Sequence, residues 1–131
     1  MRASLDESRD SSSPDDAALG EFLRLAEGDF HARIAACPGV AAVLFTAPAC
    51  GACRTWKRVL PDALAGVAAA LVEVDVSEAT GVARGFEIFH LPTIYLYRDG
   101  RFHAELQAVA RPEAVRAVAR ELLAAPAQSE P

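Results

Sequence analysis

Apolar residues along the chain form two kinds of pattern, and these alternate from one end to the other. Continuous apolar runs that include branched residues indicate strands buried on both faces, because a strand with one exposed face alternates instead. Such runs lie at residues 40–45 and 91–97, and a third, at residues 69–76, is broken by Glu73 and Asp75. A weak alternation at residues 21–26 indicates either a short strand or the end of a helix.

The segments between these runs predict helices, either by their apolar spacing or by the residues that bound them. We expect helices at residues 29–36, 51–64, 77–84 and 113–123. Asp29 and Ser77 stand at two of the starts, and both are residue types that cap helix N-termini. The tight-turn pair Asp99-Gly100 predicts that the last apolar run folds back into a strand at residues 101–106.

The order of these elements is β-α-β-α-β-α-β-β-α, which predicts an α/β domain. We expect a central mixed β-sheet, mostly parallel in its first part, flanked by helices on both faces. Residues 1–16 are acidic and Ser-rich, and we expect a disordered tail there because few apolar side chains are available to bury. The domain is expected at residues 17–124, followed by a flexible C-terminal tail at residues 125–131.

The chain has 131 residues and a net charge of −5. Residues 1–16 hold five acidic residues against two arginines, so they carry −3 of that charge. The absence of a basic stripe argues against a nucleic-acid partner. No apolar stretch approaches the ~20 residues that span a bilayer, so no membrane association is expected. Three cysteines, with no apolar leader at the N-terminus, predict a cytoplasmic protein.

Two cysteines, Cys50 and Cys53, lie where the apolar run at 40–45 meets the following helix. Open α/β folds usually place their sites at this edge of the sheet. A helix N-terminus also stabilises a thiolate, since its unpaired N–H groups and its dipole favour an anion. We expect Cys50 to be exposed at the cap and Cys53 to be buried one turn further on. This asymmetry suits thiol–disulfide exchange, in which the first cysteine attacks and the second resolves the mixed disulfide.

Two other uses of a C-x-x-C pair remain open at this point. A structural zinc site needs four ligands, and Cys37, the three histidines and the carboxylates show no ligand spacing. A purely structural disulfide would close a very small ring and so stabilise the fold little. Exchange is favoured over both, and neither a metal nor another cofactor is expected. Cys37 is expected to be a small apolar residue at a helix end, with a regulatory or dimer-forming thiol as the alternative.

Four stretches, taken in order, resemble the thioredoxin family over residues 21–123. They are V-L-F-T-A-P-A at 43–49, C-G-A-C at 50–53, L-P-T-I-Y-L-Y at 91–97 and R-D-G at 98–100. The resemblance implies a thioredoxin-like fold in which Cys50 is the nucleophile and Cys53 the resolving thiol. It also implies a cis peptide bond at Pro92, opposite the pair. The residues that would contact an extended substrate are Ala49, Gly51, Ala52, His90, Leu91 and Pro92.

The activity that this resemblance implies is that of a thiol–disulfide oxidoreductase acting on disulfide-containing client proteins, in cell redox homeostasis and electron transport. Its electrons would come from a thioredoxin-reductase-type flavoenzyme or from low-molecular-weight thiols. A disulfide isomerase, an oxidase and a glutathione-linked exchanger are alternatives within the same chemistry. A thioredoxin-fold peptide-binding or chaperone module with little redox activity is the alternative from another class.

The chain departs from the family pattern immediately before the cysteine pair and beneath it. Ala49 replaces the usual tryptophan before the first cysteine, and Leu44 replaces a buried aspartate that assists the resolving thiol. We hypothesise that Glu73, on the neighbouring strand, points under the pair and acts as the general base. A solvated or Arg-paired glutamate is the alternative.

The chain also departs from the family pattern next to the expected cis-proline. Phe89 and His90 are bulkier than the family's usual residue there and would narrow the substrate groove, in which Ala108 takes the place of a glycine. His90 is expected either to influence the Cys50 thiolate or to be a surface loop histidine. The other two histidines, His31 and His103, are expected at the surface.

Overall fold

The computed structural model describes residues 22–131, and the acidic tail predicted at residues 1–16 lies outside this range. The described elements follow the predicted order of strands and helices. They are β2 (Leu23–Arg24), α2 (Phe30–Ala35), β3 (Val40–Thr46), α3 (Gly51–Ala63), β4 (Ala70–Asp75), α4 (Thr80–Gly85), β5 (Thr93–Arg98), β6 (Arg101–Glu105) and α5 (Pro112–Ala124). None of the helices in residues 22–131 is both long enough and apolar enough to cross a membrane.

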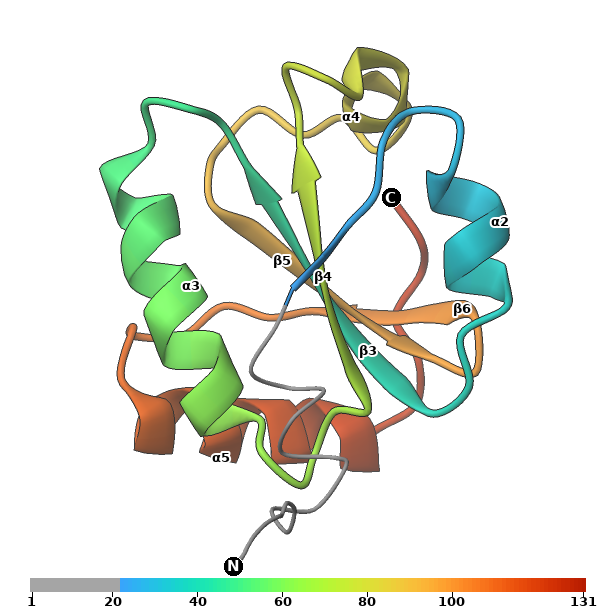
Figure 1. The fold of residues 1–131 in the computed structure, drawn as a ribbon. Coiled ribbons are helices and arrows are strands. Elements are labelled where there is room, and N and C mark those ends of the chain that lie inside the picture. The colour runs from blue at the N-terminus through green and yellow to red at the C-terminus, as the bar shows by residue number, and fades with distance from the viewer. Residues whose placement is uncertain (1–21) are drawn as a thin grey trace, which may run out of the picture.

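The strands form one mixed sheet in the order β2-β4-β3-β5-β6, with helices on both faces (Figure 1). β2, β4 and β3 run parallel, whereas β5 and β6 are antiparallel to their neighbours. One apolar layer lies between the sheet and helices α3 and α5. The other lies between the sheet and helices α2 and α4. The predicted fold class, a mixed sheet that is parallel in its first part, is therefore confirmed.

The central strand β3 supplies side chains to both layers. Leu44 belongs to the apolar cluster under α3 and α5, whereas Val43 and Phe45 belong to the cluster under α2 and α4. All three are fully buried. The unbroken apolar run in the sequence therefore follows from the helices that cover both faces of this strand.

Two predicted helix caps are wrong in detail. α4 begins at Thr80 and not at the turn of Ser77, because the Ser77 hydroxyl donates to Oδ1 of Asp75 (2.6 Å) and its amide donates to the same oxygen (2.9 Å). Asp29 precedes α2 as expected, but its side chain makes no capping hydrogen bond. Both residues lie near the start of a helix as predicted, but neither side chain caps it.

His103 on β6 was expected at the surface and is only 6% exposed. Its Nε2 lies 2.8 Å from the Leu122 carbonyl oxygen and 3.1 Å from that of Ala125, at the end of α5. The last carbonyls of a helix lack partners within the helix, so this imidazole satisfies them. The tail that follows, expected to be flexible, makes a specific contact with the same strand, because Gln128 N donates to the His103 carbonyl (2.7 Å).

The turn between β5 and β6 packs against the end of α2. Asp99 and Gly100 have φ angles of 51° and 82°, in the left-handed region that favours glycine. The Asp99 carboxylate accepts a hydrogen bond from the amide of Gly39 (2.7 Å). A side chain at Gly100 would collide with the carbonyl group of Ala35. The hairpin turn therefore needs glycine both for its backbone conformation and for this close approach.

We expect Gly100→Ala to lower the free energy of unfolding by about 2–4 kcal/mol, through left-handed strain together with the collision at Ala35. Gly85→Ala is the matched control, since Gly85 closes α4 and a Cβ there meets nothing within 4 Å. The control is expected to leave stability unchanged or to raise it by up to ~1 kcal/mol. Urea unfolding measures both, and equal effects of the two substitutions would contradict this account of the turn.

The Asp75 carboxyl at the end of β4 has a lowered pKa. The Ser77 hydroxyl, the Ser77 amide and the Arg24 guanidinium hold the pKa of the buried Asp75 carboxyl below its ordinary value, against the opposing effect of burial. A lowered pKa in the folded state contributes stability above the unfolded-state value of about 3.9, and this contribution is lost as the pH falls through the folded-state pKa.

We therefore expect Asp75→Asn to lower the free energy of unfolding by about 1 kcal/mol at pH 7, and the difference from the wild type to shrink as the pH falls below about 4. Urea unfolding as a function of pH measures the effect. Asp62→Asn, on the exposed side of α3, is the control. If the stability difference between Asp75→Asn and the wild type stays constant from pH 7 into the acid range, the role given to this carboxylate is disproved.

Candidate active site

The cysteine pair lies at the predicted junction, where β3 ends and α3 begins. After Thr46 the chain makes a turn in which Cys50 N donates to the Ala47 carbonyl (3.2 Å). Cys50 is the N-cap residue of α3, and its Sγ accepts a hydrogen bond from the amide of Cys53 (3.1 Å). The two cysteines form a disulfide, with their Cα atoms 5.2 Å apart. The sulfur of Cys50 therefore satisfies one of the free amides of the helix N-terminus.

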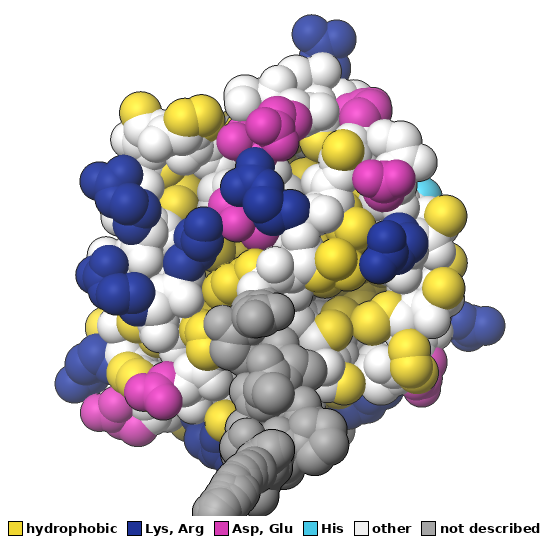
Figure 2. All heavy atoms as spheres, in the orientation of Figure 1, with side chains coloured by type: hydrophobic (Ala, Val, Ile, Leu, Met, Phe, Trp, Pro, Cys, Tyr) yellow, Lys and Arg dark blue, Asp and Glu magenta, His cyan; other side chains and the backbone are white. Residues whose placement is uncertain are grey.

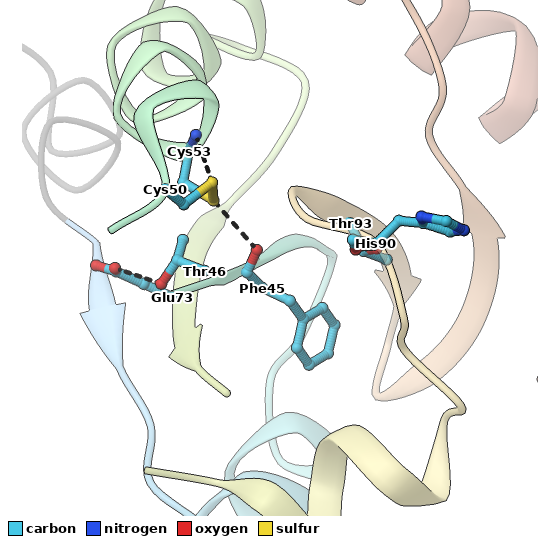
Figure 3. The surroundings of a disulfide bond; sticks show 7 residues. All are labelled: Phe45, Thr46, Cys50, Cys53, Glu73, His90 and Thr93. Carbon is cyan, nitrogen blue, oxygen red and sulfur yellow. Dashed lines mark hydrogen bonds between the residues drawn. A yellow bond between two sulfur atoms is a disulfide. The ribbon is translucent and has the colours of Figure 1, made fainter. Parts of the chain in front are cut away.

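The two sulfurs have different surroundings (Figure 3). Cys53 is 2% exposed, and its Sγ lies 3.9 Å from the Phe45 carbonyl oxygen of β3. Cys50 is only partly buried. An incoming sulfur can therefore reach Cys50 and not Cys53. This is the asymmetry predicted from the sequence, and it allows the two thiols to act one after the other.

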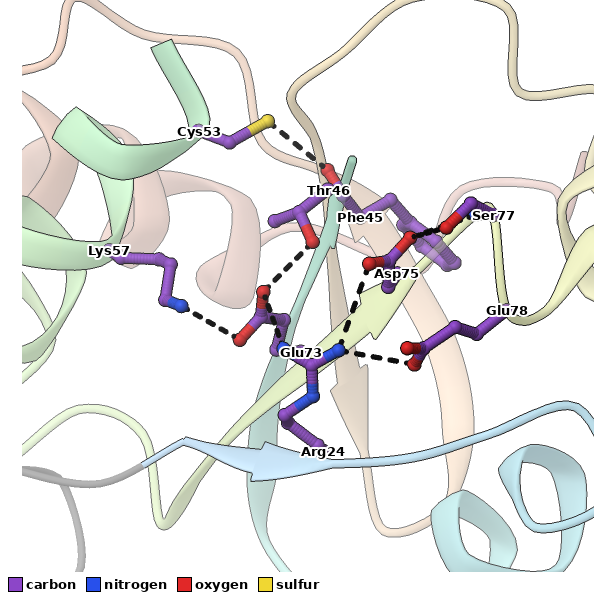
Figure 4. Close-up of polar contacts among 9 residues, drawn as sticks. All are labelled: Arg24, Phe45, Thr46, Cys53, Lys57, Glu73, Asp75, Ser77 and Glu78. Carbon is purple, nitrogen blue, oxygen red and sulfur yellow. Dashed lines mark hydrogen bonds and ion pairs between the residues drawn. The ribbon is translucent and has the colours of Figure 1, made fainter. Parts of the chain in front are cut away.

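Glu73 lies under the pair and is 5% exposed. It is paired in the sheet with Leu44, the position at which the family pattern has a carboxylate. Its Oε2 accepts a hydrogen bond from the Thr46 hydroxyl (2.9 Å), and its Oε1 lies 3.0 Å from Lys57 Nζ. Arg24 Nη1 is 3.5 Å from Oε2. Figure 4 shows these groups converging on the carboxylate. Glu73 is thus buried and not solvated, and it is paired with Arg24, as one form of the alternative had it.

Lys57, Thr46 and Arg24 were not singled out from the sequence. Lys57 is four residues after Cys53 on α3, so the two lie on the same side of that helix. That spacing was available in the sequence. Thr46 and Arg24 reach Glu73 from two other strands, β3 and β2, and their contacts depend on strand order, which the sequence pattern does not specify.

A cavity of about 350 Å³ connects the pair with this carboxylate. Its lining includes Cys50, Cys53, Lys57 and Glu73. A cavity of this size with polar walls has room for water, which needs two to four polar partners. A proton can therefore pass between Cys53 and Glu73 through water, without direct contact between the two side chains.

The loop before β5 lies across from the disulfide (Figure 3). The Leu91–Pro92 peptide bond is cis. The Thr93 hydroxyl donates to the His90 carbonyl (2.6 Å), which ties the loop to the start of the strand. The imidazole of His90 is exposed and points away from the cysteine pair, as expected of a surface loop histidine.

A groove of about 660 Å³ begins at this loop. Its walls include His90, Pro92 and Ala108, three of the positions that the resemblance places near the substrate, together with Trp56. Phe89, which also lines the groove, is 82% exposed. Exposed aromatic side chains of this size are common where a protein binds a partner.

Cys37 lies at the end of α2 as a free, partly buried thiol. Burial raises its pKa, which disfavours the reactive thiolate and fits a small apolar residue better than a redox thiol. Within residues 22–131, no three His, Cys, Asp or Glu side chains are arranged to hold a metal ion.

Comparisons with known proteins agree with this geometry. The family model that matches the chain is Thioredoxin, over residues 21–121. Protein disulfide-isomerase A3 of chicken is 31% identical over 90 residues, which are 64% of this chain. The match covers only 17% of the isomerase's own length. A thioredoxin of Staphylococcus aureus is 28% identical over 82 residues, which are 61% of this chain and 77% of that protein.

Solved structures with the same fold include mitochondrial thioredoxin 3 of Saccharomyces cerevisiae, with a TM-score of 0.65, 20% identity and coverage of 79% of this chain and 98% of that one. Thioredoxin of Trypanosoma brucei brucei has a TM-score of 0.66 at 19% identity, covering 83% of this chain and 96% of that one. At these identities the structures show the shared fold alone. Since the family model covers most of the chain and the cysteine pair stands at the start of α3, the chain belongs to the thioredoxin family.

Proposed function

We propose that the chain is a thiol–disulfide oxidoreductase that cycles between dithiol and disulfide at Cys50 and Cys53 and acts on disulfides of client proteins. One observation carries the proposal. The two sulfurs stand at one helix N-terminus with different access, Cys50 partly exposed and Cys53 buried against β3. A pair that only crosslinked the chain would not need this difference.

The reaction requires no group beyond the two cysteines. In the reduced chain, the Cys50 thiolate attacks one sulfur of a client disulfide and expels the other client sulfur as a thiolate, which takes up a proton. Cys53 then loses its proton and attacks Sγ of Cys50, which releases the second client thiol. Two electrons have passed to the client, and the chain is left with the Cys50–Cys53 disulfide.

We propose that Glu73 accepts the Cys53 proton through water in the 350 Å³ cavity that both residues line. The Thr46 hydroxyl and Lys57 hold this carboxylate in place from β3 and α3. Glu73 does not touch the reacting sulfurs in the contacts described above, so it is a positioning and proton-accepting residue and not a nucleophile.

The client is proposed to lie across the pair in an extended form. The backbone of Leu91 beside the cis-proline Pro92 would contact it on one side, with Ala49, Gly51 and Ala52 around the attacking sulfur and His90 at the edge of the groove. Pairing of a client backbone with Leu91 would resemble the addition of a strand to a sheet, in which backbone hydrogen bonds supply affinity.

Electrons for the next cycle would come from a thioredoxin-reductase-type flavoenzyme or from low-molecular-weight thiols, and the chain would serve redox homeostasis in the cytoplasm. An odd, small number of cysteines is typical of a reducing compartment. Disulfide isomerisation is a second candidate activity, favoured by the match to an isomerase domain. The same two cysteines would serve it, with the client's own thiol resolving the mixed disulfide.

Cys53→Ser is expected to trap clients as stable mixed disulfides on Cys50, because attack still occurs and resolution does not. Cys50→Ser should lose turnover of a model protein disulfide altogether. Cys37→Ser is the control and should turn over like the wild type. Non-reducing gels and mass spectrometry detect the trapped species. If the wild type reduces no disulfide and the Cys50→Ser variant still binds the same partners, the peptide-binding module is favoured instead.

Glu73→Gln is expected to slow the resolution step by about 10²-fold, the lower range for loss of a general base, and to leave the first attack by Cys50 nearly unchanged. Acid-quenched single-turnover mixing measures the two steps separately, because the mixed disulfide should accumulate. A purely structural defect would slow the first attack as well, so a loss confined to the resolution step distinguishes the two roles.

The control for Glu73→Gln is Glu78→Gln. Glu78 contacts the same Arg24 guanidinium (3.1 Å) but is largely exposed and does not line the cavity of the cysteines. Unchanged resolution in the Glu73 variant, or an equal loss in the Glu78 variant, would contradict proton transfer to Glu73.

A further inference from the structure

The groove beside Pro92 has both apolar and polar walls. It runs from Trp56 and Pro92 to the loop after α4 on one side and the segment after β6 on the other. Phe86, Ile88 and Leu106 contribute to it, and Phe89 stands exposed along it. A groove of about 660 Å³ with these walls can hold one or two large side chains of a client segment.

The charged side chains that line this groove are of one sign. They are the carboxylates Glu87 and Glu105, and no lysine or arginine is among the lining residues. Glu105 accepts a hydrogen bond from the Gln107 amide (3.3 Å), and within residues 22–131 neither carboxylate is in an ion pair. Both are therefore available to a cation on a bound segment.

The other side of the cysteine pair has the opposite character. Arg54, Lys57 and Arg58 lie on α3, and Figure 2 shows Lys and Arg side chains gathered over this helix. In the 350 Å³ cavity at the cysteines, Arg24 and Lys57 are paired with the carboxylates Glu73 and Asp75, whereas Arg54 lines the cavity from an exposed position on α3. A client lying across the pair thus meets carboxylates on the cis-proline side and the exposed Arg54 and Arg58 on the α3 side, so its charge pattern affects how well it binds.

Glu87 is held by a fixed backbone. α4 ends at Gly85, Glu87 N donates to the Arg84 carbonyl (3.0 Å), and Ile88 N donates to the Ala83 carbonyl (2.9 Å). These two bonds end the helix. The residue at this position after a helix is usually glycine, because its φ is positive. Glu87 has a φ of 55°. The chain therefore carries a carboxylate at a groove position where glycine would be the easier residue for the backbone.

We propose that the chain selects clients in which a basic side chain stands beside an apolar one near the reactive disulfide. The apolar side chain would pack on Phe89 and the groove wall, and the lysine or arginine would pair with Glu87 and Glu105. This proposal rests on the proposed oxidoreductase function, and it assigns the two carboxylates as specificity-determining residues for that reaction.

The test uses two peptides, each with one cysteine. One peptide has Lys-Leu beside the cysteine and the other has Glu-Leu, and they are otherwise identical. Each cysteine is joined through a disulfide to the same small neutral thiol. The full chain reduces the disulfide of each substrate to two thiols and is itself oxidised to the Cys50–Cys53 disulfide. Dithiothreitol then reduces the chain again. The rate for each peptide is divided by its rate with dithiothreitol alone, because a neighbouring charge alters the intrinsic reactivity of a cysteine. Bis(2-hydroxyethyl) disulfide measures turnover by the pair without a peptide.

We expect kcat/KM for the Lys-Leu peptide to exceed that for the Glu-Leu peptide by roughly threefold to tenfold at low ionic strength, the range for two exposed ion pairs. The ratio should approach one in 0.5 M salt, because exposed charges are then screened. It should also approach one in the double variant Glu87→Gln, Glu105→Gln, while Glu113→Gln on α5, outside the groove, keeps it. Phe89→Ser should lower kcat/KM for both peptides alike.

A ratio near one in the wild type, or a preference for the Glu-Leu peptide, would overturn the proposed selectivity. If bis(2-hydroxyethyl) disulfide is still reduced in that case, the oxidoreductase function stands and only the selectivity fails. If no disulfide is reduced at all, the proposed function fails and the selectivity fails with it.

Discussion

The free amides in the first turn of α3 are the constraint on which the site depends. They need an acceptor, and the chain supplies the sulfur of Cys50, which accepts from Cys53 N at 3.1 Å. A thiolate is a better acceptor than a thiol and is further stabilised by the helix dipole. The arrangement requires α3 to begin within a few residues of the end of β3. The buried strand and its two covering layers hold that junction in place.

The polar cluster beneath the pair is difficult to explain by stability alone. Burying Glu73 costs free energy that its contacts with Lys57 and Thr46 only partly offset, and an apolar side chain of similar size would pack there at lower cost. Leu44, directly opposite in the sheet, is such a side chain. The chain therefore keeps one carboxylate near Cys53, and it lies on β4 and not on β3. This fits the proposed role of Glu73 as acceptor of the proton that the resolving thiol must lose.

The sequence was sufficient for the element order, the mixed sheet and the position of the cysteine pair, because each depends on local pattern. A continuous apolar run implies cover on both faces, and a C-x-x-C after such a run falls at a helix start. The polar contacts could not be predicted as well. Ser77 bonds to Asp75 instead of capping α4, His103 is buried against the end of α5, and Arg24 reaches Glu73 from a neighbouring strand. Each involves a choice between partners that only the tertiary structure decides.

The redox equilibrium of Cys50 and Cys53 tests most directly whether the two cysteines exchange electrons as a pair. The chain is equilibrated in buffers of reduced and oxidised dithiothreitol, and alkylation with mass spectrometry counts the thiols. Trp56, three residues beyond Cys53 and 8% exposed, gives a fluorescence signal in parallel. We expect one reversible transition in which two thiols appear together while Cys37 stays reduced. A chain that forms no disulfide between Cys50 and Cys53 in any of these buffers would contradict it.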